Sequence, residues 1–194
     1  MNNNTTVERH EFMLKIVDLS IGCLANVAYY RSGRQNGHKL FRGEPYSQFN
    51  ANCFFLVHLE WCKLFGNENQ EKHHWCKLVS DKEKFKTGLL CVLDYDDDTY
   101  TKFQNKILKV RNKLVAHQDK YEKIYSANFD QVITSVSYLI NYIYANEMDG
   151  IPIKDRYNPA EAYEKYYRWG ETFWNGSTPE DDPENKLKLR TVKI

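Results

Sequence analysis

The sequence is poor in glycine and proline, has no long apolar run and carries almost no net charge. Only 9 glycines and 5 prolines occur among 194 residues, which disfavours a turn-rich sandwich or barrel and favours long helices. The net charge of +1 excludes a globally basic nucleic-acid binder and still allows a local basic patch. Because no run approaches the length of a bilayer span, the sequence predicts no transmembrane segment. The first residues also lack the basic and apolar regions of a secretory signal.

The remaining composition is that of an ordinary globular domain. Hydrophobic residues make up 42% and charged residues 27% of the chain, which excludes intrinsic disorder throughout. The five cysteines are an odd number scattered through apolar stretches. We therefore expect reduced thiols and a cytoplasmic protein.

Apolar residues recur at helical spacing almost throughout the chain, and no convincing strand pair is visible. The spacing predicts an all-α fold with long helices at about 6–31, 47–65, 80–92, 99–116 and 127–146. Ser80 and Glu83 have the spacing of a capping box that begins the third of these. The segment 47–65 is apolar on nearly every side, so we expect it to be the central buried helix.

Two boundaries divide the chain into a bundle and two appendages. We expect a helical bundle over 1–148, a C-terminal docking helix within 149–175 and a polar tail over 176–194. Asn158 and Pro159 have the positions of an N-cap and a first helical residue in the second unit. That helix is dense in aromatic residues, whose spacing suits docking on the core, dimerisation or stacking on RNA bases.

The most informative stretch lies near the end of the predicted helix 99–116. Four apolar residues fall within one narrow, core-facing sector of this helix: Phe103, Ile107, Val110 and Leu114. Arg111 projects about 70° to one side of that sector and His117 about 50° to the other, while Asn112 points away from it. Arg111 and His117 thus border the buried face.

A strip of lysines follows the same helix. Lys102, Lys106, Lys109 and Lys113 fall within a sector of roughly 60° that continues to His117. Such a strip is a plausible track for a phosphate backbone, with Lys106, Lys109 and Lys113 as RNA-binding candidates. The alternative is a solvated face whose charges complement the helix dipole.

The motif resembles that of a known superfamily. Arg111, the polar Asn112, four further residues and His117 resemble the signature of HEPN domains, and Arg-Asn-Lys-Leu-Val-Ala-His-Gln-Asp is similar to the abortive-infection AbiU-type branch. The resemblance implies an up-and-down helical bundle and a metal-independent endoribonuclease that needs no cofactor. It further implies a toxin or phage-defence effector that acts as a homodimer, with an antitoxin or an activating protein as a possible partner.

The residues suit that chemistry. Attack by the RNA 2′-hydroxyl requires proton transfer, which His117 can provide as general acid or base because imidazole titrates near neutral pH. Arg111 offers a planar fork of donors to the phosphoryl oxygens, and Asn112 can orient a group or hold the local backbone. Because Arg111 and His117 lie about 120° apart on one helix, a two-fold axis that joins two motifs would complete the site.

Two alternatives remain open. Some HEPN domains are non-catalytic interaction or nucleotide-binding modules, which is the first alternative. In the branch that a nucleotidyltransferase antitoxin controls, a tyrosine stands at the position of Asp119, so we do not expect adenylylation at this position. Five residues could also converge on zinc, although no Cys-x-x-Cys pair is present and buried thiols are the favoured interpretation: His58, Cys62, His73, His74 and Cys76.

Overall fold

The computed structural model describes residues 3–35, 38–39, 46–116, 128–148 and 157–174, and these form an all-α fold, as predicted. The helices are α1 (Asn3–Ser32), α2 (Tyr46–Phe65), α3 (Lys82–Leu93), α4 (Asp97–Ala116), α5 (Phe129–Asn146) and α6 (Pro159–Trp174), with a short 3₁₀ helix, η1 (Trp75–Lys77). Two-residue strands β1 (Arg34–Gln35) and β2 (His38–Lys39) pair in antiparallel register. That pairing was not predicted.

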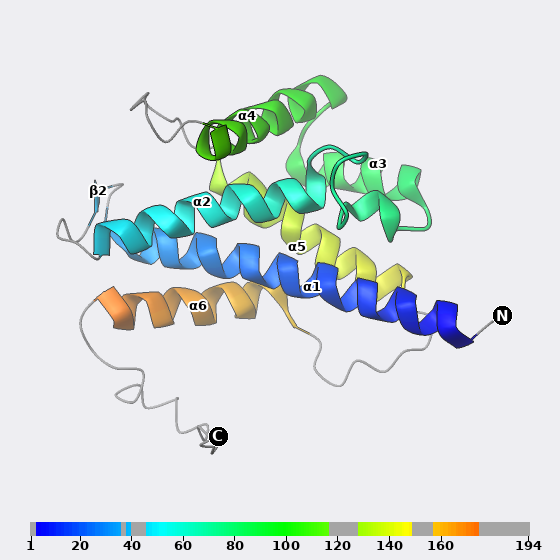
Figure 1. The fold of residues 1–194 in the computed structure, drawn as a ribbon, viewed down its shortest axis with the longest axis horizontal. Helices are drawn as coiled ribbons and strands as arrows, with labels where there is room; N and C mark the ends of the chain where they lie inside the picture. The colour runs from blue at the N-terminus through cyan, green and yellow to red at the C-terminus, as the bar shows by residue number, and fades with distance from the viewer. Residues whose placement is uncertain (1–2, 36–37, 40–45, 117–127, 149–156, 175–194) are drawn as a thin grey trace, which may run out of the picture.

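The centre of the fold is α1. Figure 1 shows α2 along one side of α1 and α6 along the other, with α5 crossing α1 as well. α2 runs antiparallel to α1, as the contacts of Asn26 with Glu60 and of Tyr30 with Phe54 show. The prediction that 47–65 is the central helix was wrong. α1 is packed by three helices, α2, α5 and α6, whereas α2 is packed mainly by α1 and α4.

The aromatic-rich helix α6 lies on the bundle. Gly170 permits a close approach to α1, because a Cβ at that position would lie 2.0 Å from Ser32 Oγ. The Trp174 indole N–H donates to the Tyr29 carbonyl at 3.3 Å, and the Tyr29 and Tyr166 rings meet edge to face at 5.8 Å. Many of the aromatic side chains of α6 are therefore engaged with α1 and α2. The proposed tail, 176–194, lies outside the described residues.

Part of α1 meets the criteria for a membrane-spanning helix. Val7–Ser32 is long and apolar enough to cross a bilayer by length and composition, although polar residues interrupt its apolar runs, so the sequence prediction of no such segment did not include it. In the fold, 56% of its most apolar part is buried inside the protein. The core helix of a globular domain has the same length and composition, so these two properties do not assign α1 to a membrane.

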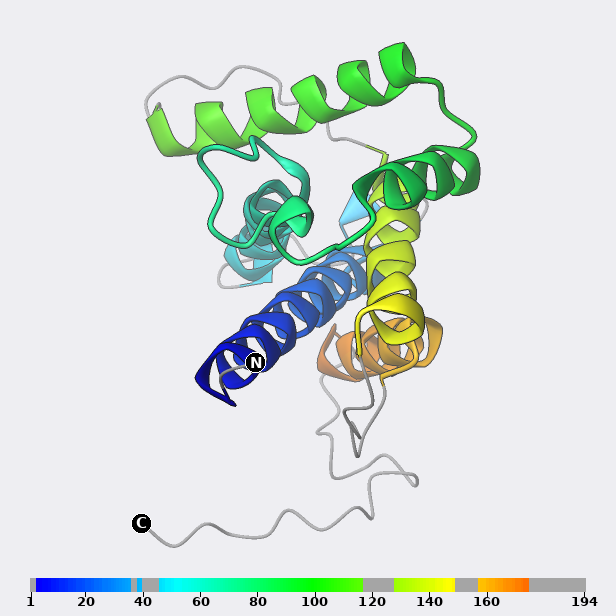
Figure 2. The ribbon, with the colours of Figure 1, turned by 90° about the vertical axis from the view of Figure 1, so that its right-hand side faces the viewer.

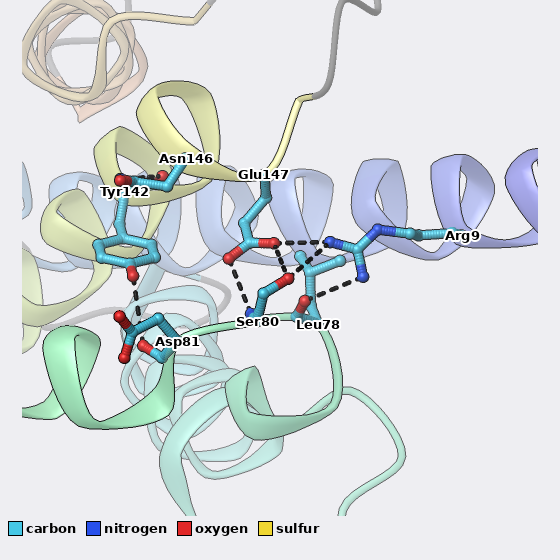
Figure 3. A network of polar contacts seen from close by, with 7 residues as sticks. All are labelled: Arg9, Leu78, Ser80, Asp81, Tyr142, Asn146 and Glu147. Atoms are coloured by element: carbon cyan, nitrogen blue, oxygen red, sulfur yellow. Dashed lines mark hydrogen bonds and ion pairs between the residues drawn. The ribbon is translucent and has the colours of Figure 1, made fainter.

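A buried carboxylate after α5 forms hydrogen bonds with α1 and with the segment before α3 (Figure 3). Glu147, only 3% exposed, follows α5 and accepts hydrogen bonds from Arg9 of α1 at 2.6 Å and from the Ser80 backbone N–H and hydroxyl at 2.8 Å each. Ser80 is thus not the N-cap of α3, as its spacing with Glu83 predicted. Asp81 takes that position and accepts from the Lys84 backbone N–H at 3.0 Å.

We predict that Glu147→Ala destabilises the fold by about 2 kcal/mol, because it leaves the Ser80 N–H and the Arg9 guanidinium without their shared acceptor. Urea unfolding followed by circular dichroism measures the change. Glu164→Ala removes the carboxylate of an exposed ion pair with Arg168 and should cost less than about 0.5 kcal/mol. Equal losses in the two variants would contradict a structural role for the Glu147 contacts.

Candidate functional site

The candidate site lies at the second half of α4, which crosses the C-terminal end of α2 (Figures 1 and 2). The Gln104 side-chain amide donates to the Phe65 and Gly66 carbonyls at 2.6 and 3.0 Å, which satisfies the last carbonyls of α2. Phe103 packs edge to face on Trp61 at 5.3 Å. Ile107 and Val110 are buried as the helical pattern predicts, and the side chain of Leu114 lies outside the described residues.

Arg111 is held from two directions. Its Nη1 forms an ion pair with Glu71 Oε1, and its Nε donates to Asn112 Oδ1 at 3.1 Å. The side chains of Arg111 and Glu71 are only 18% and 16% exposed. Within the described part of the chain, the remaining Nη2 has no hydrogen-bond partner, so this amino group is left to donate to a ligand.

Glu71 was missed by the sequence reasoning. It belongs to the segment 66–81 between α2 and α3, which Figure 2 shows under the second half of α4. Its backbone is fixed as well, because Glu71 N donates to the Asn67 carbonyl at 2.9 Å and Lys77 Nζ donates to the Glu71 carbonyl at 2.7 Å. Glu71 is a single acidic residue in a polar loop and lies forty positions before Arg111, so no sequence pattern indicates that the two residues interact.

The other predicted site residues are not gathered around Arg111. His117 lies outside the described residues. Lys106 and Lys109 are exposed and form no ion pair with any described residue, while Lys113 is half-buried. By the helical periodicity the three lysines lie on the flank of α4 roughly opposite to Arg111. In one protomer, the lysine strip and the arginine therefore face different surfaces.

The zinc alternative finds no support among the described residues, where no three metal-binding side chains converge. His58 Nδ1 bonds to the Phe54 carbonyl at 2.8 Å, and His74 Nδ1 accepts from the Cys76 N–H at 3.3 Å, so the two rings are engaged separately. Burial raises the pKa of Cys62 to about 12 although Arg111 opposes the rise, so this thiol stays protonated at neutral pH. Cys91, expected in apolar surroundings, is exposed.

Comparisons of the chain with protein-family models, with curated proteins and with solved structures found no match.

We predict that Arg111 and Glu71 couple by about 1–2 kcal/mol in a double-mutant cycle of Arg111→Ala and Glu71→Ala, because both side chains are largely shielded from solvent. The cycle compares the free energies of unfolding in urea of the wild type, the two single variants and the double variant. The exposed pair Arg168 and Glu164 provides the matched control and should couple by less than about 0.5 kcal/mol. A coupling no larger than the control would mean that Glu71 does not hold Arg111 in solution.

Proposed function

We propose that this protein is a metal-independent endoribonuclease of the HEPN type that acts as a cytoplasmic toxin or phage-defence effector. The observation that carries the proposal is the fixed orientation of the Arg111 side chain. Its guanidinium is oriented by Glu71 and Asn112 near the end of α4, six residues before His117, and keeps Nη2 available for a phosphoryl oxygen. A preorganised cation of this kind stabilises charge that develops in a transition state.

The proposed reaction needs no group that the chain does not supply. The RNA 2′-hydroxyl attacks the adjacent phosphorus, and His117 as general base takes its proton. The bond between the phosphorus and the 5′-oxygen of the next nucleotide breaks, and the protonated histidine donates a proton to this oxygen. The products are a 2′,3′-cyclic phosphate and a 5′-hydroxyl end. Arg111 stabilises the dianionic phosphorane, and Asn112 orients Arg111 by accepting from its Nε.

One observation favours a second function, a non-catalytic interaction or nucleotide-binding module of a defence or toxin–antitoxin system. Glu71 neutralises the charge of Arg111, and a largely buried ion pair of this kind also occurs as a purely structural contact. In that case Arg111 would join α4 to the segment 66–81 and take no part in chemistry.

The proposal includes a homodimer, because Arg111 and His117 project from different sides of one helix. A two-fold axis beside α4 would bring Arg111 of one protomer to His117 of the other and place the strip of Lys106, Lys109 and Lys113 along the shared surface as an RNA track. Control by an antitoxin or an activating protein is part of the same proposal.

The first experiment incubates the purified protein with mixed cellular RNA in EDTA. We expect the wild type to cleave RNA, and His117→Ala and Arg111→Ala to lose at least about 100-fold in rate, because each removes proton transfer or charge stabilisation. Asn112→Ala should lose less, since it only loosens Arg111. Arg168→Ala, which removes an arginine from an exposed ion pair on α6, should cleave like the wild type.

Intact RNA in the wild-type reaction would contradict the ribonuclease and favour the non-catalytic module. Cleavage that persists in His117→Ala would assign the activity to other residues or to a contaminant.

A second experiment tests the composite site by mixing two inactive variants. Arg111→Ala and His117→Ala are combined in equal amounts and left to exchange subunits. If each site takes Arg111 from one protomer and His117 from the other, half of the dimers hold one intact site, and about a quarter of the wild-type activity returns. Light scattering of the same samples reports the dimer. A mixture no more active than its two components would contradict a site shared between protomers.

A further inference from the structure

A basic surface surrounds His73 on the side of α4 that carries Arg111. Four exposed lysines contribute to it, one from α1, one from α2 and two from the segment 66–81. We call these residues and the histidine the His73 patch: Lys15, Lys63, Lys72, His73 and Lys77. The sequence reasoning did not find this surface, because its residues are spread over more than sixty positions and follow no helical period.

The imidazole of His73 is fixed at the middle of the patch. Its ring stacks on Phe12 of α1 at 5.9 Å with an interplanar angle of 17°. Burial, followed by the charges of the four lysines, lowers the pKa of His73. The ring is therefore neutral near pH 7, and the positive charge of the patch belongs to the lysines.

These lysines have few acidic neighbours among the described residues: the charge of Lys63 acts on the carboxyl of Glu60, which lies one helical turn before it on α2. None of the four forms an ion pair within the described part of the chain, although Glu11 lies one helical turn before Lys15. On the neighbouring α3, by contrast, Lys82 pairs with Glu68 and Lys86 pairs with Asp97. Four like charges gathered on a chain of net charge +1 repel one another, and a polyanion would offset that repulsion.

The patch is continuous with the held arginine. Glu71, which binds Arg111, directly precedes Lys72 and His73, and its carbonyl accepts from Lys77 Nζ at 2.7 Å. The same short segment thus positions the guanidinium and presents the lysines. A strand of phosphates lying on the patch would therefore approach Arg111 along the segment that binds it.

We propose that the His73 patch binds the phosphate backbone of a single-stranded RNA and leads it to Arg111. This inference rests on the proposed ribonuclease function and adds to it a substrate path on the flank of α4 opposite to the lysine strip. Lysine ammonium groups that neutralise phosphates release condensed counterions, so binding should depend steeply on salt.

The test measures binding of a fluorescein-labelled single-stranded RNA of mixed sequence to the full chain by fluorescence anisotropy, with His117→Ala as the parent so that the probe is not cleaved. The patch variant replaces Lys15, Lys63 and Lys72 by Gln and keeps Lys77, which supports Glu71. The matched control replaces Lys84, Lys86 and Lys165 by Gln, three lysines of α3 and α6 that have partners outside the segment 66–81. Both variants lose the same charge.

We expect the patch variant to bind at least about tenfold more weakly than the parent and its log K to log salt slope to be about 2 smaller, the value for three lost phosphate contacts with a single strand. The control should bind within about twofold of the parent, since its lysines lie away from the RNA path. The patch variant should melt at the temperature of the parent, because its three substituted lysines are exposed and form no hydrogen bond or ion pair within the described part of the chain.

The outcomes separate this inference from the proposed function. A patch variant that binds like the control overturns the inference, and it leaves the ribonuclease standing if the wild type cleaves RNA. A third variant, with Lys106, Lys109 and Lys113 replaced by Gln, then reports whether the RNA lies on the opposite flank alone. If the parent binds no RNA, the inference fails together with RNA as the substrate.

Discussion

The burial of α1 from several sides is the constraint on which the rest of the structure depends. α2, α5 and α6 all pack on this helix, and its residues Ile16, Leu24 and Val27 have no exposed surface. A helix covered in this way must be apolar around most of its circumference, which is why it also meets the composition of a membrane span. The Glu147 contacts then fix the N-terminal part of α1 to the end of α5 and to the start of α3.

Because the core is complete around α1, α4 is free to lie at the edge of the fold. Its main neighbour is α2, to which Phe103 and Gln104 attach its first half. The second half adds the buried Ile107 and Val110, and the pair of Arg111 and Glu71 attaches it to the segment 66–81. An element placed in this way can present polar residues to a ligand without disturbing the apolar packing, since most of its side chains outside one stripe face away from α2.

The helices could be predicted from the sequence, because their apolar residues repeat with a period that local geometry alone sets. The buried stripe of Phe103, Ile107 and Val110 was found for the same reason. Glu71 and Ser80 could not be assigned in this way. Their roles depend on partners that lie 40 and 67 positions away, and a local pattern contains no information about such contacts. The choice of α1 over α2 as the central helix likewise depends on how α6 returns to the bundle.

The charges of the chain follow a related logic. Although the net charge is only +1, lysines gather in two groups, one along α4 and one around His73, which the core face of α4 separates. The first is periodic within one helix and is visible in the sequence, whereas the second exists only when α1, α2 and the segment 66–81 come together. Arg111 adjoins the second group, because Glu71 draws it to that side. Helical periodicity directs the proposed catalytic arginine away from the first basic surface, and its pairing with Glu71 joins it to the segment that carries part of the second.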